Sequence, residues 1–209
     1  MANYFIKTPW WLKKIYPGRL WSMSAIEKKI YLTFDDGPHP VATTFVLDEL
    51  KKYNAKATFF CIGKNVIEHP AIYKRIIDEG HSTGNHTQNH FNGWKTSNDI
   101  YLQDVTAASK HIKSNLFRPP YGRLRSKQAK KIGDAIDDKS AKIVMWDILS
   151  GDFDETFSKE QCLKNVMTKT GKGSIIVFHD SEKAFARLQY VLPLFLSDFA
   201  QKGYAFKRL

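Results

Sequence analysis

Two adjacent carboxylates early in the chain, Asp35 and Asp36, follow an apolar stretch at residues 30–34 and precede a Gly-Pro turn. Because neighbouring side chains of an extended chain point to opposite faces, these two carboxylates would meet different surroundings. A strand that ends in a carboxylate pair and breaks into a loop is the usual layout of an α/β active site. The alternative interpretation is that the pair caps a turn, where Asp is common.

Two histidines, His86 and His90, stand four residues apart in a polar segment. On a helical turn this spacing puts both imidazoles on one face, close enough to share a metal ion. Asp36 would complete a set of two imidazoles and one carboxylate, which favours Zn²⁺ and also suits Co²⁺, Mn²⁺, Fe²⁺ or Ni²⁺. Three protein ligands leave positions open for water and substrate. Taken alone, the two histidines could equally face solvent on a loop.

Two further segments carry groups suited to charge stabilisation and proton transfer. Arg118 begins the run Arg-Pro-Pro-Tyr-Gly, in which consecutive prolines restrict the backbone and hold Arg118 and the Tyr121 amide in place. His179 ends an apolar run at residues 174–178, and its intrinsic pKa suits a proton donor or acceptor. The alternatives are a surface loop for the first segment and a core histidine bonded to a backbone carbonyl for the second.

Strand-like stretches alternate with helical patterns along the chain, which predicts a parallel sheet but does not distinguish a closed barrel from an open one. Expected strands lie near residues 30–35, 56–61, 81–85, 115–118, 142–146, 174–179 and 204–208. Expected helices span residues 41–53, 70–79, 97–115, 126–136, 158–170 and 184–202. Pro193 in the last helix predicts a kink or a break there.

Taken together, these segments make the chain resemble the polysaccharide deacetylases of the NodB-homology type, carbohydrate esterase family 4. The segments that carry the resemblance are T-F-D-D-G-P, H-T-Q-N-H, R-P-P-Y-G, W-D-I-L-S-G-D-F and I-V-F-H-D, which occur in the family's order between Thr33 and Asp180. The resemblance implies an α/β fold, a distorted (β/α) barrel with about seven parallel strands. It places the active site at the C-terminal ends of those strands.

The resemblance also implies catalytic roles, position by position. Asp36, His86 and His90 would bind the metal, and Asp35 would be the general base. The family pattern pairs Arg118 with Asp35, which would hold that carboxylate ionised.

The general acid and the substrate contacts follow in the same way. His179 would be the acid, with Asp152 orienting and charge-stabilising it. The backbone N–H of Tyr121 would help to bind the oxyanion. Val177 and Phe153 match positions that line a pocket for the acetyl methyl group; the family usually has Trp at the second of these, and Phe loses the indole N–H while keeping an apolar wall.

These roles describe a metal-dependent hydrolase that removes N-acetyl groups from a glycan containing N-acetylglucosamine, of the peptidoglycan or chitin type. A strong proton donor matters more for an amine leaving group than for an alcohol, which favours N-deacetylation. The alternatives are an O-acetyl esterase acting on a xylan-type polysaccharide and a noncatalytic glycan-binding relative.

Composition fits one globular catalytic domain at residues 29–209 preceded by an N-terminal arm at residues 1–28. The 209 residues carry a net charge of +11 and only two cysteines, so no disulfide framework is expected. No nucleic-acid-binding motif accompanies the basic charge, and a polyanionic substrate or envelope surface explains the charge more simply. The default interpretation is a solvated basic surface that binds no partner.

The first 29 residues combine six Lys or Arg with one acid and several aromatic side chains. They lack the apolar core of a signal peptide and are too short and charged to span a bilayer. The cytoplasm is therefore the default compartment. The sequence itself specifies neither the compartment nor the oligomeric state. We expect the arm to pack across the barrel; the alternative is an interfacial segment at a membrane surface.

Overall fold

The computed structural model describes residues 4–209 as an alternation of short strands and helices. The strands are Arg19–Leu20 (β1), Lys29–Asp35 (β2), Thr58–Cys61 (β3), Ser82–Asn85 (β4), Leu116–Phe117 (β5), Lys142–Val144 (β6), Ile148–Leu149 (β7), Ile175–His179 (β8) and Ala205–Lys207 (β9). The helices are Trp10–Ile15 (α1), Ala42–Lys52 (α2), Gly63–Glu68 (α3), Pro70–Asp78 (α4), Asn98–Ser109 (α5), Ser126–Ala129 (α6), Ile132–Ala135 (α7), Lys159–Lys169 (α8) and Glu182–Gln201 (α9), with a 3-10 turn at Pro120–Gly122 (η1).

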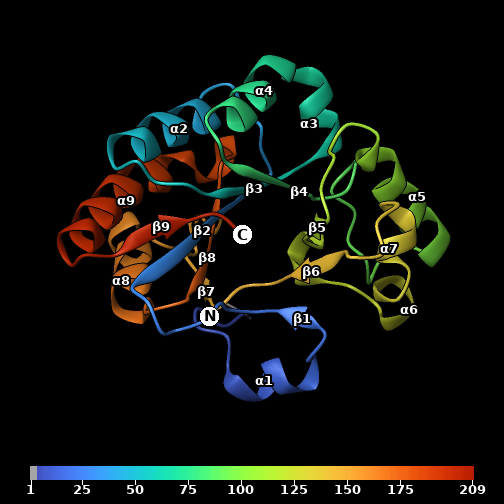
Figure 1. Ribbon diagram of the computed structural model, residues 1–209, viewed down its shortest axis with the longest axis horizontal. Helices are drawn as coiled ribbons and strands as arrows, with labels where there is room; N and C mark the ends of the chain where they lie inside the picture. The colour runs from blue at the N-terminus through green and yellow to red at the C-terminus, as the bar shows by residue number, and fades with distance from the viewer. Residues whose placement is uncertain (1–3) are drawn as a thin grey trace.

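All pairings between these strands are parallel, in the order β1-β6-β5-β4-β3-β2-β8-β7, with β9 added beside β2. The strands surround the middle of the molecule and the helices lie outside them (Figure 1). The expected distorted (β/α) barrel is thus confirmed. Two strands that the sequence pattern missed, β1 and β7, have two residues each, too few to show an alternating pattern.

The core lies between the sheet and helices α2, α8 and α9. The central strand β2 buries Ile30, Leu32 and Phe34, and Phe34 stacks between Phe59 and Phe178 with ring centroids 5.1 and 5.9 Å away. Burial of each such side chain stabilises the fold by about 2 kcal/mol. Both cysteines are buried and free, as expected.

Some helix boundaries differ from the expected ones. The helix expected to reach residue 115 ends at Ser109, because the Ser114 hydroxyl donates to the Thr83 carbonyl and accepts from the Leu116 N–H, which turns the chain into β5. The helix expected at residues 126–136 is divided into α6 and α7. Helix α9 runs without a break through Pro193.

The described part of the N-terminal arm, residues 4–28, lies between β6 and β7, where the sheet is open. Its strand β1 pairs with β6, whereas Lys7 forms an antiparallel bridge to Ile148 in β7. The Thr8 N–H donates to the Asp147 carbonyl over 2.8 Å. Helix α1, between these two contacts, projects from the barrel (Figure 1). Within residues 4–209, no helix is long and apolar enough to cross a membrane.

Helix α9 owes its continuity to the burial of its apolar face. Phe195 is fully buried, and its ring lies 4.5 Å from that of Phe199 and 6.2 Å from that of Phe178. Phe195→Ala should therefore lower the free energy of unfolding by about 3–5 kcal/mol. The adjacent Leu194 is 43 % exposed, and Leu194→Ala should change stability by less than about 1 kcal/mol. Urea denaturation of the two variants tests this, and equal effects would contradict the packing described.

Candidate active site

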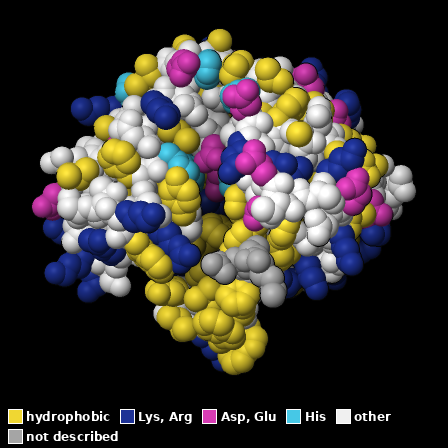
Figure 2. All heavy atoms as spheres, turned by 180° about the vertical axis from the view of Figure 1, so that it is seen from behind, with side chains coloured by type: hydrophobic (Ala, Val, Ile, Leu, Met, Phe, Trp, Pro, Cys, Tyr) yellow, Lys and Arg dark blue, Asp and Glu magenta, His cyan; other side chains and the backbone are white. Residues whose placement is uncertain are grey.

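Polar side chains gather at one end of the barrel because parallel strands bring their C-terminal ends to the same edge. Strands β2, β4, β5 and β8 end at or next to Asp35, His86, Arg118 and His179. Figure 2 shows histidine and carboxylate side chains beside a hollow in this face. The hollow is a pocket of about 540 Å³. All the site residues expected from the sequence line it except two, Arg118 and Asp152, which are buried beneath it.

Asp36, His86 and His90 converge on one point. Their ligand atoms lie within 4.8 Å of one another, and Asp36 Oδ1 is 3.1 Å from His90 Nε2 and 3.6 Å from His86 Nε2. Within the described residues, this buried oxygen accepts no hydrogen bond of good geometry. A buried carboxylate oxygen without a donor, facing two imidazole nitrogens, is an arrangement that a divalent cation would satisfy.

The loop that carries the two histidines is not the helical turn that their spacing suggested, so that expectation is wrong. Thr87 and His90 have positive φ values, 65° and 58°, which no helix contains. The Asp104 carboxylate of α5 holds this loop in shape by accepting the N–H groups of Gln88 and Asn89 over 2.9 and 3.0 Å. The imidazoles meet because of this clamp rather than because of helical periodicity.

The tautomer of His86 is fixed by the backbone. His86 Nδ1 lies 2.7 Å from the Arg118 carbonyl oxygen, which can only accept, so Nδ1 carries the proton and Nε2 presents its lone pair to Asp36. Burial lowers the pKa of His86 to about 4, so the imidazole is neutral at neutral pH. A neutral, oriented imidazole is the form that binds a metal.

The Asp36 carboxylate is held ionised by its neighbours. Burial acts to raise its pKa, but the nearby imidazoles of His90 and His179 outweigh burial and keep the pKa below its usual range. The Asp36 backbone turns through a positive φ of 83°, and its carbonyl accepts the Asn65 Nδ2–H over 2.7 Å. This turn directs Asp36 away from Asp35.

Asp35 is paired with Arg118 inside the barrel. Arg118 Nη1 donates to Asp35 Oδ1 over 2.6 Å and to the Thr33 hydroxyl over 2.7 Å. Nη2 donates to the Met145 carbonyl over 2.9 Å, and the guanidinium carbon lies 4.0 Å from the centre of the Phe60 ring. The predicted pair is therefore formed at a fully buried cation.

His179 is paired with the buried Asp152. Its Nδ1 lies 2.8 Å from Asp152 Oδ1, and its backbone N–H donates to Oδ2 over 2.8 Å. Burial acts to lower the pKa of His179, but the Asp152 charge and hydrogen bond outweigh burial and raise the pKa to about 9. The imidazole is therefore protonated at neutral pH, with Nδ1–H bonded to Asp152 and the other N–H directed to the pocket that His179 lines.

The remaining expected residues form the pocket walls. The Phe153 ring lies 4.9 Å from the His179 ring, and Val177 is buried on β8. The Tyr121 ring lies 4.7 Å from that of His90, and a positive φ of 59° at Tyr121 turns the backbone at this point.

Two aspartates that support the site were missed in the sequence. Besides Asp104, Asp180 backs the loop after β2: its Oδ1 accepts the Gly37 N–H over 3.1 Å, and a Cβ on Gly37 would lie 2.1 Å from its Oδ2. The sequence does contain a signal for each of them. Asp104 interrupts an apolar helix face that includes Tyr101 and Val105, and Asp180 directly follows His179. A buried carboxylate in an apolar pattern needs partners.

Comparison with known proteins gives a consistent result. The polysaccharide deacetylase family model matches residues 23–136. A peptidoglycan-N-acetylglucosamine deacetylase of Bacillus cereus is 33 % identical over 195 residues, which cover 89 % of this chain and 88 % of that protein. The peptidoglycan-N-acetylglucosamine deacetylase PgdA of Listeria monocytogenes is 33 % identical over 185 residues, 86 % of this chain but only 37 % of that protein.

A solved structure agrees with these matches. The Bc1960 peptidoglycan N-acetylglucosamine deacetylase superposes with a TM-score of 0.86 and 30 % identity, covering 97 % of this chain and 95 % of that chain. Taken with the family model and the curated relatives, this places the chain in the NodB-type polysaccharide deacetylase family, carbohydrate esterase family 4, as a hydrolase that removes acetyl groups from a polysaccharide.

Proposed function

We propose that this protein removes N-acetyl groups from N-acetylglucosamine residues of a peptidoglycan-type glycan. The observation that carries the proposal is the opposed pairing across one pocket: a carboxylate beside a buried guanidinium on one side and an imidazolium beside a buried carboxylate on the other. The names of the relatives point to the same substrate class. The arm at residues 1–28 and the catalytic domain at residues 29–209 would act as one unit.

Asp36, His86 and His90 would hold a divalent metal, with Zn²⁺ best suited to two nitrogens and one oxygen and Co²⁺, Mn²⁺, Fe²⁺ or Ni²⁺ as alternatives. When bound, such a metal polarises a carbonyl oxygen and makes water a better nucleophile at neutral pH. The protein's own contribution is a neutral His86 and an ionised Asp36, so these two groups are already in the protonation state that binds a metal.

Asp35 would take the proton from the attacking water. The Arg118 guanidinium fixes the carboxylate through Oδ1 and places a buried positive charge beside it. The negative charge that develops on the acetyl oxygen would be stabilised in part by the Tyr121 N–H, because a fixed backbone donor needs no reorganisation during the reaction.

His179 would donate the proton that lets the sugar nitrogen leave. Its pKa of about 9 keeps it protonated at neutral pH, and an amine leaves far more readily when protonated than as an anion. Phe153 and Val177 would border the acetyl methyl group with apolar surface.

Substitution of the proposed base tests the reaction. Asp35→Asn should lower kcat for acetate release from an N-acetylglucosamine pentamer by about 10²- to 10⁴-fold, because the attacking water loses its proton acceptor. Asp99→Asn, at an exposed position on α5, should leave this kcat unchanged. Wild-type rates in Asp35→Asn would contradict this role, and release from acetylated xylan but not from the pentamer would favour an O-acetyl esterase.

The metal site can be tested without turnover. Protein treated with a chelator should bind one Zn²⁺ per chain by calorimetry, and His90→Ala should weaken binding by about 100-fold or more because one of three ligands is lost. His111→Ala removes an exposed histidine and should leave the affinity unchanged. Equal affinities in both variants would show that the ion binds elsewhere.

The pH profile tests the His179–Asp152 pair. If activity needs a protonated His179, this group supports activity at every pH below its pKa of about 9, and activity falls as the pH rises through that value. Asp152→Asn removes the charge that raises this pKa, while burial, which lowers it, remains. The alkaline limb of kcat/KM should therefore move down by about one to two pH units. An alkaline limb at the same pH in the variant would contradict the assignment.

A further inference from the structure

A second pocket adjoins the catalytic pocket and is built largely by the N-terminal arm. It has a volume of about 300 Å³ and shares part of its wall, including Tyr4, Tyr121, Arg123 and Trp146, with the catalytic pocket. The two pockets are thus adjacent. We propose that this second pocket binds a neighbouring pyranose ring of the same glycan chain; this inference rests on the proposed deacetylase function.

The chemistry of the lining suits a sugar ring. Its lining combines Phe5, Trp11 and Tyr16 of the arm with Trp94 and Trp146 of the barrel. Aromatic faces accept the C–H face of a pyranose. Two guanidinium groups supply donors for the sugar hydroxyl groups, and each lies against an aromatic ring. The guanidinium carbon of Arg123 is 4.2 Å from the centre of the Trp94 ring, and that of Arg19 is 4.3 Å from the centre of the Tyr16 ring. An apolar pocket with a few fixed polar groups is typical of small-molecule sites.

The arm is fastened to the barrel, so this wall exists before substrate binds. Asp147 accepts from Lys13 over 2.7 Å and from Lys7 over 3.3 Å. The Tyr4 hydroxyl donates to Asp154 Oδ2 over 2.6 Å, and its ring packs 5.2 Å from that of Phe153. A preformed wall spares the entropic cost of ordering the arm on binding.

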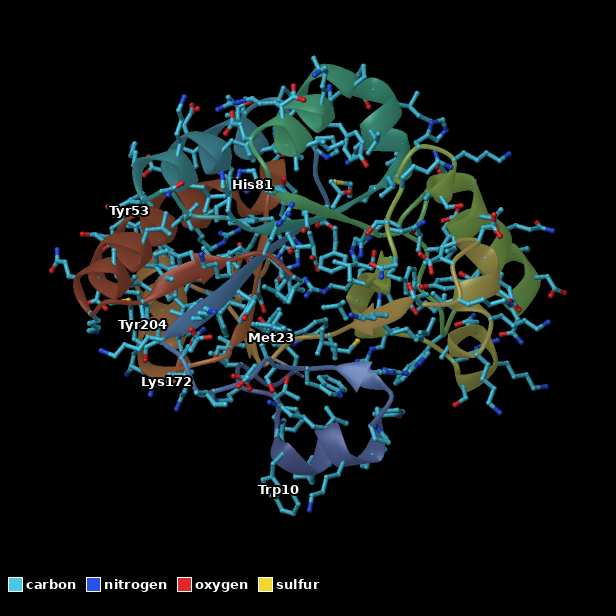
Figure 3. All side chains as sticks on the ribbon, in the orientation of Figure 1. Trp10, Met23, Tyr53, His81, Lys172 and Tyr204 are labelled. Atoms are coloured by element: carbon cyan, nitrogen blue, oxygen red, sulfur yellow. The ribbon has the colours of Figure 1, made fainter. Side chains whose placement is uncertain are left out.

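A membrane surface is the competing occupant for the aromatic side chains of the arm. Figure 2 shows that the projecting arm is largely apolar, and Figure 3 shows Trp10 pointing away from the barrel. Trp10 is 69 % exposed and does not line the second pocket, whereas its neighbour Trp11 does. The wall that the second pocket shares with the catalytic pocket favours the sugar, and variants of the two tryptophans distinguish the alternatives.

The test compares Trp11→Ala with the matched variant Trp10→Ala, and adds Trp94→Ala on the barrel side in case the arm is disturbed. Metal-loaded enzymes are assayed on the N-acetylglucosamine pentamer and on p-nitrophenyl acetate, which has no second sugar. We expect kcat/KM on the pentamer to fall about five- to tenfold in Trp11→Ala and Trp94→Ala, with the ester unchanged. Trp10→Ala should match wild type on both.

Calorimetric binding of the pentamer to the Asp35→Asn protein gives a readout that does not need turnover. In that background, Trp11→Ala and Trp94→Ala should each weaken pentamer binding by a similar factor. Wild-type binding and kinetics on the pentamer in both Trp11→Ala and Trp94→Ala would overturn the inference. Equal losses of kcat/KM on the pentamer and on the ester would overturn it as well. If only Trp10→Ala loses binding to anionic phospholipid vesicles while pentamer kinetics never change, the arm contacts membranes instead. Absence of acetate release from wild type, with pentamer binding still dependent on Trp11, would overturn the proposed reaction and leave the sugar site standing.

Discussion

The burial of one positive charge, the guanidinium of Arg118, is the constraint on which the rest of the site depends. An unpaired charge in a protein interior costs several kcal/mol, so the barrel must surround this group with acceptors. Asp35, Thr33 and the Met145 carbonyl supply them. The Arg118 carbonyl oxygen, in turn, fixes the tautomer of His86. One residue therefore sets both the charge beside the proposed base and the orientation of a metal ligand, and neither could change without disturbing the other.

The same principle separates two carboxylates that are neighbours in the chain. Two adjacent anions in a poorly solvated pocket would raise each other's pKa, unless each has its own positive partner. The positive φ of Asp36 turns it toward the imidazoles, while Asp35 stays on the strand beside Arg118. Across the pocket the polarity is reversed, because the buried Asp152 keeps His179 positively charged. A carboxylate beside a buried cation thus faces, across one pocket, an imidazole whose positive charge is stabilised by a buried carboxylate.

The local pattern of the sequence predicted the strands whose ends carry the site, whereas residues such as Asp152 and Phe153 were identified by the resemblance to the family and not by that pattern. It failed where distant contacts decide the backbone. The His86–His90 loop takes its shape from Asp104, a side chain on the following helix, so the four-residue spacing suggested a helix that does not exist. Pro193 lies within an unbroken helix because the burial of neighbours such as Leu192 and Phe195 outweighs the lost hydrogen bond. Neither effect is visible in a short window of sequence.

The arm shows how an element of the fold also shapes the surface beside the site. The strands β6 and β7 follow each other in the chain but do not pair, and the arm bonds to both. The two lysines that pair with Asp147 account for part of the basic charge of this segment, which in sequence resembled a membrane-surface pattern. The contacts that fill the gap in the sheet also bring Trp11 and Tyr16 into the lining of the second pocket. The same contacts therefore complete the barrel and build the wall of the second pocket. Loosening the arm would then affect extended glycans more than small acetyl esters.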